Sequence, residues 1–310
     1  MSYAISRTLG CLCLSLLVIA CASRGEAEAE GQPAAAPDGL SFDAGASRAP
    51  GLQVPVPGGR LFAEDRGTGP VIVFIHGGQL DRRVFDDSFE ELAADFRVMR
   101  YDVRGYGQSS DPEAPYASHD DLVVLLDALD GERAHLVGFS LGGRIALDAA
   151  LVAPDRVASL VLVGPGISGW EWSMEDIETF GAMRERAIAG DLEGATEAWL
   201  QHPWMQPAME DPARAEAIRA IALDNARCWT HTAPDLPLDP PALRRLDEIR
   251  CPTLVLVGDR DLRSIHEIAG TIGSGVEGAE VVEIEDCGHV VPMEQPGALT
   301  ARIRSFVPRD

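Results

Sequence analysis

The chain has 310 residues, enough for one large α/β domain with an inserted subdomain. Its 49 acidic and 26 basic residues give a formal net charge of −23, which excludes the positively charged surface that binds nucleic acid. Hydrophobic residues make up 46% of the chain and charged residues 24%, proportions that predict a sizeable core.

The amino terminus has the pattern of an export signal. One positive charge, Arg7, precedes an apolar run over residues 9–20 that is too short to span a bilayer comfortably. The run ends in the sequence VIAC, which is similar to a bacterial lipobox, where the cysteine is lipidated and becomes the first mature residue. We therefore expect a signal peptide over residues 1–20 and an exported lipoprotein anchored to the membrane through Cys21. The alternative is cleavage at the sequence ACA, residues 20–22, which gives a soluble secreted or periplasmic protein.

Residues 21–50 are rich in Ala, Glu, Gly and Pro and show no hydrophobic periodicity. Such a segment buries too little apolar surface to become ordered, so we expect a flexible linker. The ordered part begins near Leu52, where the segments LQVPV and RLFAED flank a Pro-Gly-Gly turn and predict an antiparallel hairpin.

Short apolar segments then alternate with helix-like ones. The expected strands cover about residues 71–75, 96–101, 134–137, 159–163, 253–257 and 280–284. The expected helices cover about residues 82–94, 119–129, 141–151, 264–272 and 296–306. Strands that are almost entirely apolar and alternate with helices predict a parallel sheet covered on both faces. Ser118 precedes one of the helices, and Asp121 follows three residues later, which is the spacing of a capping box.

Residues 168–238 interrupt this alternation with three helical stretches and a proline-rich return. The segment contains four of the seven methionines and all five tryptophans, which are Trp170, Trp172, Trp199, Trp204 and Trp229. The aromatic side chains either form the core of a small helical subdomain or act as an apolar lid over a pocket. The two roles are compatible, and we expect one or two of the tryptophans to face the pocket.

The sequence GFSLG, centred on Ser140, lies between an apolar strand and a helix, the setting in which a G-x-S-x-G motif exposes a nucleophilic serine. A serine hydroxyl needs a histidine base and an acid that orients it, and in a parallel sheet both belong at the carboxyl ends of strands. His289 follows the expected strand 280–284, and the other histidines are placed less favourably. Asp259 and Asp261 follow the expected strand before it, which leaves two candidate acids.

Over about residues 52–307 the chain resembles the α/β-hydrolase superfamily. The resemblance rests on the segments VIVFIHGG, YDVRGYGQSS, VGFSLGG, TLVLVGDRDL and CGHVVPMEQP. It is most similar to the 3-oxoadipate enol-lactonase and carboxylesterase group of that superfamily. The resemblance implies a mostly parallel eight-stranded sheet with helices on both faces. It places the hydrolase core in residues 51–167 and 239–310 and a helical cap, residues 168–238, between the sixth and seventh strands.

The resemblance also implies roles for individual residues. The family's G-x-x-D pattern favours Asp261 as the acid and leaves Asp259 as a surface turn residue. The family's oxyanion hole consists of two backbone N–H groups, here those of Gly78 and Leu141. The Gln79 side chain is either a third donor or a solvated loop residue, and the segment DVRG after the second parallel strand supports the rim. The residues expected to contact the substrate are Gln79, Trp170, Trp204 and Val290.

Three cysteines lie outside the expected signal: Cys228, Cys251 and Cys287. Cys251 opens one strand and Cys287 follows the end of the next, so in parallel neighbours their sulfur atoms lie at opposite ends of the sheet. We therefore expect no disulfide between them.

Together these features predict a serine hydrolase that cleaves an ester or lactone of a small, apolar substrate without a metal or an organic cofactor. Ser140 excludes haloalkane dehalogenases and epoxide hydrolases, relatives that need Asp at the position of the nucleophile. The sequence GFSLG also differs from the GGSWG that is common in proline iminopeptidases. C–C bond hydrolysis, aminopeptidase-like hydrolysis, cofactor-free haloperoxidase activity and acyl transfer use the same three residues and stay open. A non-catalytic binding protein on the same scaffold is a further alternative. We expect membrane contact only through the lipid anchor, and the sequence gives no oligomeric state.

Overall fold

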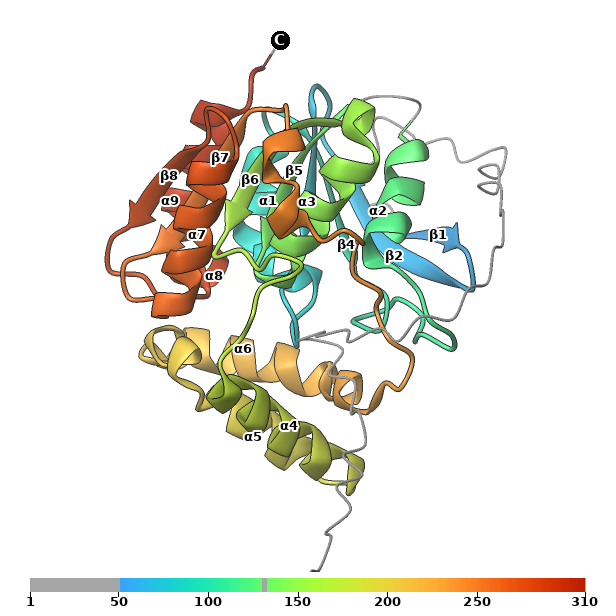
Figure 1. The fold of residues 1–310 in the computed structure, drawn as a ribbon, viewed down its shortest axis with the longest axis vertical. Coiled ribbons are helices and arrows are strands. Elements are labelled where there is room, and N and C mark those ends of the chain that lie inside the picture. The colour runs from blue at the N-terminus through green and yellow to red at the C-terminus, as the bar shows by residue number, and fades with distance from the viewer. Residues whose placement is uncertain (1–50, 130–132, 310) are drawn as a thin grey trace, which may run out of the picture.

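The computed structural model describes residues 51–129 and 133–309 (Figure 1). The predicted signal peptide, residues 1–20, the lipidation site at Cys21 and the predicted linker, residues 21–50, lie outside the described residues. Within residues 51–129 and 133–309, no helix is long and apolar enough to cross a membrane.

An eight-stranded sheet forms the centre of the fold, with the strand order β1-β2-β4-β3-β5-β6-β7-β8. Its strands are β1 (Leu52–Val56), β2 (Gly59–Arg66), β3 (Val71–Ile75), β4 (Arg97–Asp102), β5 (Ala134–Phe139), β6 (Val157–Val163), β7 (Thr253–Gly258) and β8 (Glu280–Ile284). The β1–β2 and β2–β4 pairs are antiparallel, whereas all later pairs are parallel. Every residue of β3 and β7 is buried, as expected for strands that helices cover on both faces.

The covering helices lie on both faces of the sheet. They are α1 (Asp86–Leu92), α2 (Ser118–Asp127), α3 (Leu141–Val152), α7 (Arg263–Gly275), α8 (Val291–Glu294) and α9 (Pro296–Phe306). In Figure 1, α2, α3 and α7 lie in front of the sheet, and α1 and α9 lie behind it, where they pack against each other. The predicted hairpin, the parallel strands and the flanking helices are therefore confirmed, with shifts of a few residues at their ends.

The predicted capping box at Ser118 is wrong. The α2 helix begins at Ser118 itself, and Ala117 is its N-cap without a side-chain hydrogen bond. Ser118 instead binds Asp235, which accepts hydrogen bonds from its backbone N–H (2.9 Å) and its hydroxyl (2.7 Å). Asp121 accepts from Arg104 (2.6 Å), so both residues of the expected box have tertiary partners that compete successfully with the local motif.

The segment between β6 and β7 carries α4 (Met174–Ile188), α5 (Leu192–Leu200) and α6 (Pro212–Asp224). We call residues 168–238 the insert; in Figure 1 its helices lie below the sheet. Each helix has an N-cap side chain that accepts a backbone hydrogen bond: Ser173 for α4, Asp191 for α5 and Asp211 for α6. Local capping chemistry thus explains where the three helices begin.

Buried hydrogen bonds tie both ends of the insert to the core. At its start, the Ser168 hydroxyl donates to Asp148 of α3 (2.7 Å). Near its end, Asp235 binds Ser118, as described above, and pairs with Arg144 of α3. These contacts attach the insert to α3, the helix that follows Ser140.

A second connection joins the insert to the loop after β3. The side chain of Asn225 is fully buried. Its amide nitrogen donates to Asp81 (2.8 Å), and its carbonyl oxygen accepts from the backbone N–H of Gly107 (2.7 Å). The insert is therefore attached to the two loops that follow β3 and β4, on the side where the parallel strands end.

Candidate active site

Ser140 lies at the turn between β5 and α3 in a strained backbone conformation, with φ 52° and ψ −110°. A non-glycine residue rarely has positive φ, and such strain persists only where the surrounding structure enforces it. The turn is too tight for side chains at its two glycines. A Cβ atom on Gly142 would lie 2.0 Å from the carbonyl oxygen of Ile75, and one on Gly138 would lie 2.4 Å from the carbonyl oxygen of Gly142. The glycines therefore permit the turn that presents the Ser140 hydroxyl.

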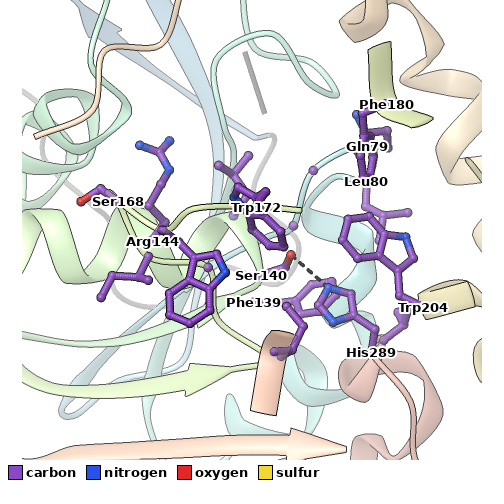
Figure 2. Close-up of a pocket in the computed structure, with 18 of the residues that line it drawn as sticks. Gln79, Leu80, Phe139, Ser140, Arg144, Ser168, Trp172, Phe180, Trp204 and His289 are labelled. Carbon is purple, nitrogen blue, oxygen red and sulfur yellow. Dashed lines mark hydrogen bonds between the residues drawn. The ribbon is translucent and has the colours of Figure 1, made fainter. Parts of the chain in front are cut away.

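The structure brings Ser140, His289 and Asp261 together. Ser140 Oγ lies 3.0 Å from His289 Nε2, and His289 Nδ1 lies 2.8 Å from Asp261 Oδ2 (Figure 2 shows the first contact). The other Asp261 oxygen accepts from the backbone N–H of Leu262 (2.7 Å), which fixes the carboxylate. A histidine protonated on Nδ1 donates to Asp261 and leaves Nε2 to accept from the serine hydroxyl.

Asp259, the other candidate acid, lies outside this arrangement. It is exposed and accepts from the backbone N–H of Cys287 (3.0 Å), a hydrogen bond that lowers the pKa of its carboxyl group. Cys228, Cys251 and Cys287 are all free thiols, as the sequence predicts for the last two. Burial raises the pKa of Cys228 to about 12, so this thiol is protonated at neutral pH.

Glu294 supports the loop that carries His289, a role that the sequence analysis missed. Its two carboxylate oxygens accept from the backbone N–H groups of Gly288 (2.7 Å) and Val290 (2.8 Å), the residues on either side of the histidine. Burial raises the pKa of Glu294, although the two hydrogen bonds oppose that effect. The feature of the sequence that could have indicated this role is an acidic residue five positions after the histidine, in the short helix α8.

A cavity of about 100 Å³ adjoins Ser140 and His289 (Figure 2). Four tryptophans of the insert line it, Trp170, Trp172, Trp199 and Trp204, so the expectation of one or two was too low. Trp229 lines a smaller neighbouring cavity instead. The remaining wall is also largely apolar and includes Phe139, Leu80, Ile167, Phe180, Met205 and Ile265.

The residues expected to contact a substrate all line this cavity: Gln79, Trp170, Trp204 and Val290. Gly78 and Leu141, the expected oxyanion donors, line it as well. Gln79 is 3% exposed and has φ 57°, so its description as a solvated loop residue is wrong. Its side-chain nitrogen lies 3.9 Å from the sulfur of Cys228, a weak contact for an amide donor.

Arg144 provides an ionic group in the cavity wall, one turn of α3 after Ser140. Its side chain is 15% exposed and pairs with both Asp235 and Asp148. The Arg144 guanidinium group therefore faces two carboxyl groups; Asp235 alone compensates its positive charge, and burial raises the pKa of Asp148. This part of the wall offers hydrogen bonding without a net positive charge.

A strained serine at a strand–helix turn, with its base and acid after later parallel strands, defines the α/β-hydrolase class of enzymes. Comparison of the sequence with protein families agrees, because the family described as "Alpha/beta hydrolase family" matches residues 72–303. The chain belongs to this family, and both the predicted fold and the resemblance are confirmed.

The chain is also similar to individual proteins. A pimeloyl-[acyl-carrier protein] methyl ester esterase of Nitrosomonas europaea is 27% identical over 251 residues, covering 74% of this chain and 92% of that protein. The solved structure of a thermophilic esterase from Thermogutta terrifontis is 30% identical with a TM-score of 0.71, covering 83% of this chain and 98% of that one. The solved structure of an enol-lactonase from Burkholderia xenovorans is 24% identical with a TM-score of 0.67, covering 82% of this chain and 99% of that one. This likeness concerns the fold alone.

Proposed function

We propose that the protein is a serine hydrolase that cleaves a carboxylic ester or lactone of a small, largely apolar substrate through an acyl-enzyme on Ser140. The observation that carries the proposal is the chain of contacts from Ser140 Oγ to His289 Nε2 (3.0 Å) and from His289 Nδ1 to Asp261 (2.8 Å), beside an aromatic cavity. The esterase names of two similar proteins support the same reaction type.

In the first step, His289 accepts the hydroxyl proton of Ser140 while the serine oxygen attacks the carbonyl carbon. The backbone N–H groups of Gly78 and Leu141 stabilise the developing oxyanion, and each such donor lowers the barrier by about 3 kcal/mol. Asp261 holds the imidazole in place and stabilises its positive charge. His289 then protonates the leaving alcohol, and the acyl group stays on Ser140.

In the second step, His289 accepts a proton from water, which attacks the acyl-enzyme. The tetrahedral intermediate collapses, the same proton returns to the oxygen of Ser140, and the carboxylic acid is released. The two steps consume only the ester and water, and they regenerate the serine hydroxyl.

The cavity favours an uncharged substrate. Its aromatic and aliphatic walls gain free energy from burying apolar groups. A carboxylate bound near Arg144 would face the Asp235 and Asp148 carboxyl groups at the same time, so the single guanidinium group would not compensate its desolvation. We therefore infer that neutral esters are better substrates than esters with a free carboxylate.

A matched pair of methyl esters tests this function. Methyl pentanoate and monomethyl glutarate have similar lengths, and the second carries a terminal carboxylate. We expect the wild type to hydrolyse methyl pentanoate with a kcat/KM at least about tenfold higher, equivalent to 1.4 kcal/mol. We expect Ser140→Ala to lose at least about 10³-fold in kcat for both esters. Equal hydrolysis by Ser140→Ala would refute the acyl-enzyme, and a preference for monomethyl glutarate would refute the substrate class.

We also propose that the protein is exported and anchored through Cys21. The support is the sequence alone: the apolar run over residues 9–20 and the VIAC sequence at its end. Cells that express the full chain with radiolabelled palmitate should label the wild type and leave Cys21→Ala unlabelled. An unlabelled wild type that appears in the culture medium or the periplasm would support ordinary cleavage and contradict the lipid anchor.

A further inference from the structure

Two aromatic side chains pack against the imidazole ring of His289. The ring of Phe139, the last residue of β5, has its centroid 5.2 Å away at an interplanar angle of 49°. The indole of Trp204 lies 5.2 Å away with an interplanar angle of 10°, an almost parallel stack. Figure 2 shows Trp204 and Phe139 next to the histidine, with the Ser140 hydroxyl at its edge.

Trp204 comes from the insert, in the short 3₁₀ turn Pro203–Met205. Two further rings pack against it: Phe180 with a centroid distance of 5.1 Å and His202 with one of 4.7 Å. Burial lowers the pKa of His202, so this neighbour is uncharged at neutral pH. Ring packing therefore positions the Trp204 indole.

The indole N–H of Trp204 contributes nothing to that position. Its Nε1 atom is buried and has no hydrogen-bond partner among the described residues. A buried donor without an acceptor is unfavourable, and most buried indole N–H groups have a partner. The orientation that stacks Trp204 on His289 is thus adopted despite the loss of a hydrogen bond.

We propose that Trp204 is a positioning residue for His289 in the reaction proposed above, on which this inference rests. Together with Phe139, it holds the imidazole in the plane where Nδ1 meets Asp261 and Nε2 meets Ser140. It also stabilises the positive charge that the imidazole acquires when it takes the serine proton, because the face of an indole attracts a cation within about 6 Å.

This second effect acts on the transition state. In the proposed reaction, the imidazole gains its positive charge as it takes the proton from Ser140. An interaction that is stronger in the transition state than in the ground state raises kcat and leaves KM almost unchanged. Loss of Trp204 should therefore lower kcat, whereas loss of a side chain that only contacts substrate should raise KM.

Steady-state kinetics with a small acetate ester distinguishes the two roles. We expect Trp204→Leu to lower kcat about tenfold, beside the rise in KM that follows from its place in the cavity wall, and Trp204→Phe to stay within about threefold of the wild-type kcat. Trp172→Leu is the matched control, because Trp172 is a half-buried tryptophan of the insert that lines the same cavity. We expect Trp172→Leu to raise KM and to keep a kcat near that of the wild type.

Tryptophan fluorescence provides a second readout that does not need the leucine variant to fold. An imidazolium group stacked on an indole quenches its emission more strongly than a neutral imidazole does. Once the phosphonate on Ser140 has lost its second ester group, it carries a negative charge on a phosphorus oxygen, and this charge stabilises protonated His289. We expect this adduct to reduce the emission of the wild type more than that of Trp204→Phe, because the other four tryptophans, three of which line the same cavity, are present in both.

Failure of this inference and failure of the proposed function have different signatures. If the wild type hydrolyses esters and is phosphonylated on Ser140, but Trp204→Leu keeps a wild-type kcat, the positioning role is refuted and the function stands. The same conclusion follows if phosphonylation quenches the wild type and Trp204→Phe equally. If the wild type shows neither hydrolysis nor phosphonylation, the proposed function itself is refuted.

Discussion

Glu294 connects the two peptide groups on either side of His289 through a pair of hydrogen bonds to one carboxylate. Glu294→Gln would turn an NH₂ group toward one of these N–H donors. An unsatisfied donor and a lost acceptor cost about 1 to 3 kcal/mol. We expect a lower melting temperature and a reduced kcat, because the loop would no longer hold the histidine against Ser140.

Thermal unfolding and steady-state kinetics measure these two effects. Glu285→Gln is the control, since Glu285 is an exposed glutamate four residues before His289 and its neutralisation should change neither quantity. A Glu294→Gln variant with the melting temperature and kcat of the wild type would show that the two hydrogen bonds of Glu294 do not support the histidine.

At the scale of elements, the turn between β5 and α3 has the strictest steric demand in the site. Gly142→Ala would place a Cβ atom 2.0 Å from the carbonyl oxygen of Ile75, a backbone atom of the neighbouring strand. Because the backbone has to move, we expect a loss of about 3 kcal/mol or more in the free energy of unfolding, together with loss of activity.

The same substitution in an open part of a helix is the matched control. A Cβ atom on Gly181, within α4, would meet nothing within 4 Å. Gly181→Ala should therefore stabilise the protein by about 0.5 to 1 kcal/mol through helix propensity. Urea unfolding gives both values, and similar stabilities for the two variants would contradict the steric account of the turn.

The loop after β3 is attached to the insert through Asp81, and this attachment depends on pH. Burial raises the pKa of Asp81, but hydrogen bonds from Arg83 and Asn225 outweigh it and lower the pKa to about 2. A carboxyl group whose pKa is lower in the folded state contributes stability above its unfolded pKa and loses it as the pH falls. The shift corresponds to about 2 kcal/mol, lost between about pH 4 and pH 2.

Asp81→Asn isolates this contribution. The difference in unfolding free energy between the wild type and the variant should be constant from pH 7 to about pH 5 and should decrease by about 2 kcal/mol at lower pH. Urea titrations at each pH measure it. A difference that stays constant down to pH 2.5 would show that the Asp81 carboxylate is not stabilised in the folded state.

At the scale of the whole molecule, the features that the sequence predicted depend on local pattern and chain order. Short apolar strands alternate with helices, and the serine, aspartate and histidine follow β5, β7 and β8, whose carboxyl ends meet at one edge of a parallel sheet. The strands, the closing helix and the three residues Ser140, Asp261 and His289 could be located in this way without tertiary information.

The remaining features depend on how the insert packs against the core. Asp235 lies 117 residues after Ser118 and 91 after Arg144, and no local pattern predicts that these three side chains meet. The capping-box prediction at Ser118 was wrong for this reason. The stack of Trp204 on His289 likewise joins residues of two separate segments, so sequence alone showed only that tryptophans gather in the insert.

The proposed function requires that Ser140 is a nucleophile activated by His289 and Asp261. Mass spectrometry after reaction with a fluorophosphonate tests it most directly, with Ser140→Ala and His289→Ala as comparisons. We predict one adduct per wild-type chain, on the peptide that contains Ser140, no adduct on Ser140→Ala, and labelling of His289→Ala slowed by at least about 10³-fold. An unmodified wild type, or an adduct that persists in Ser140→Ala, would contradict the claim.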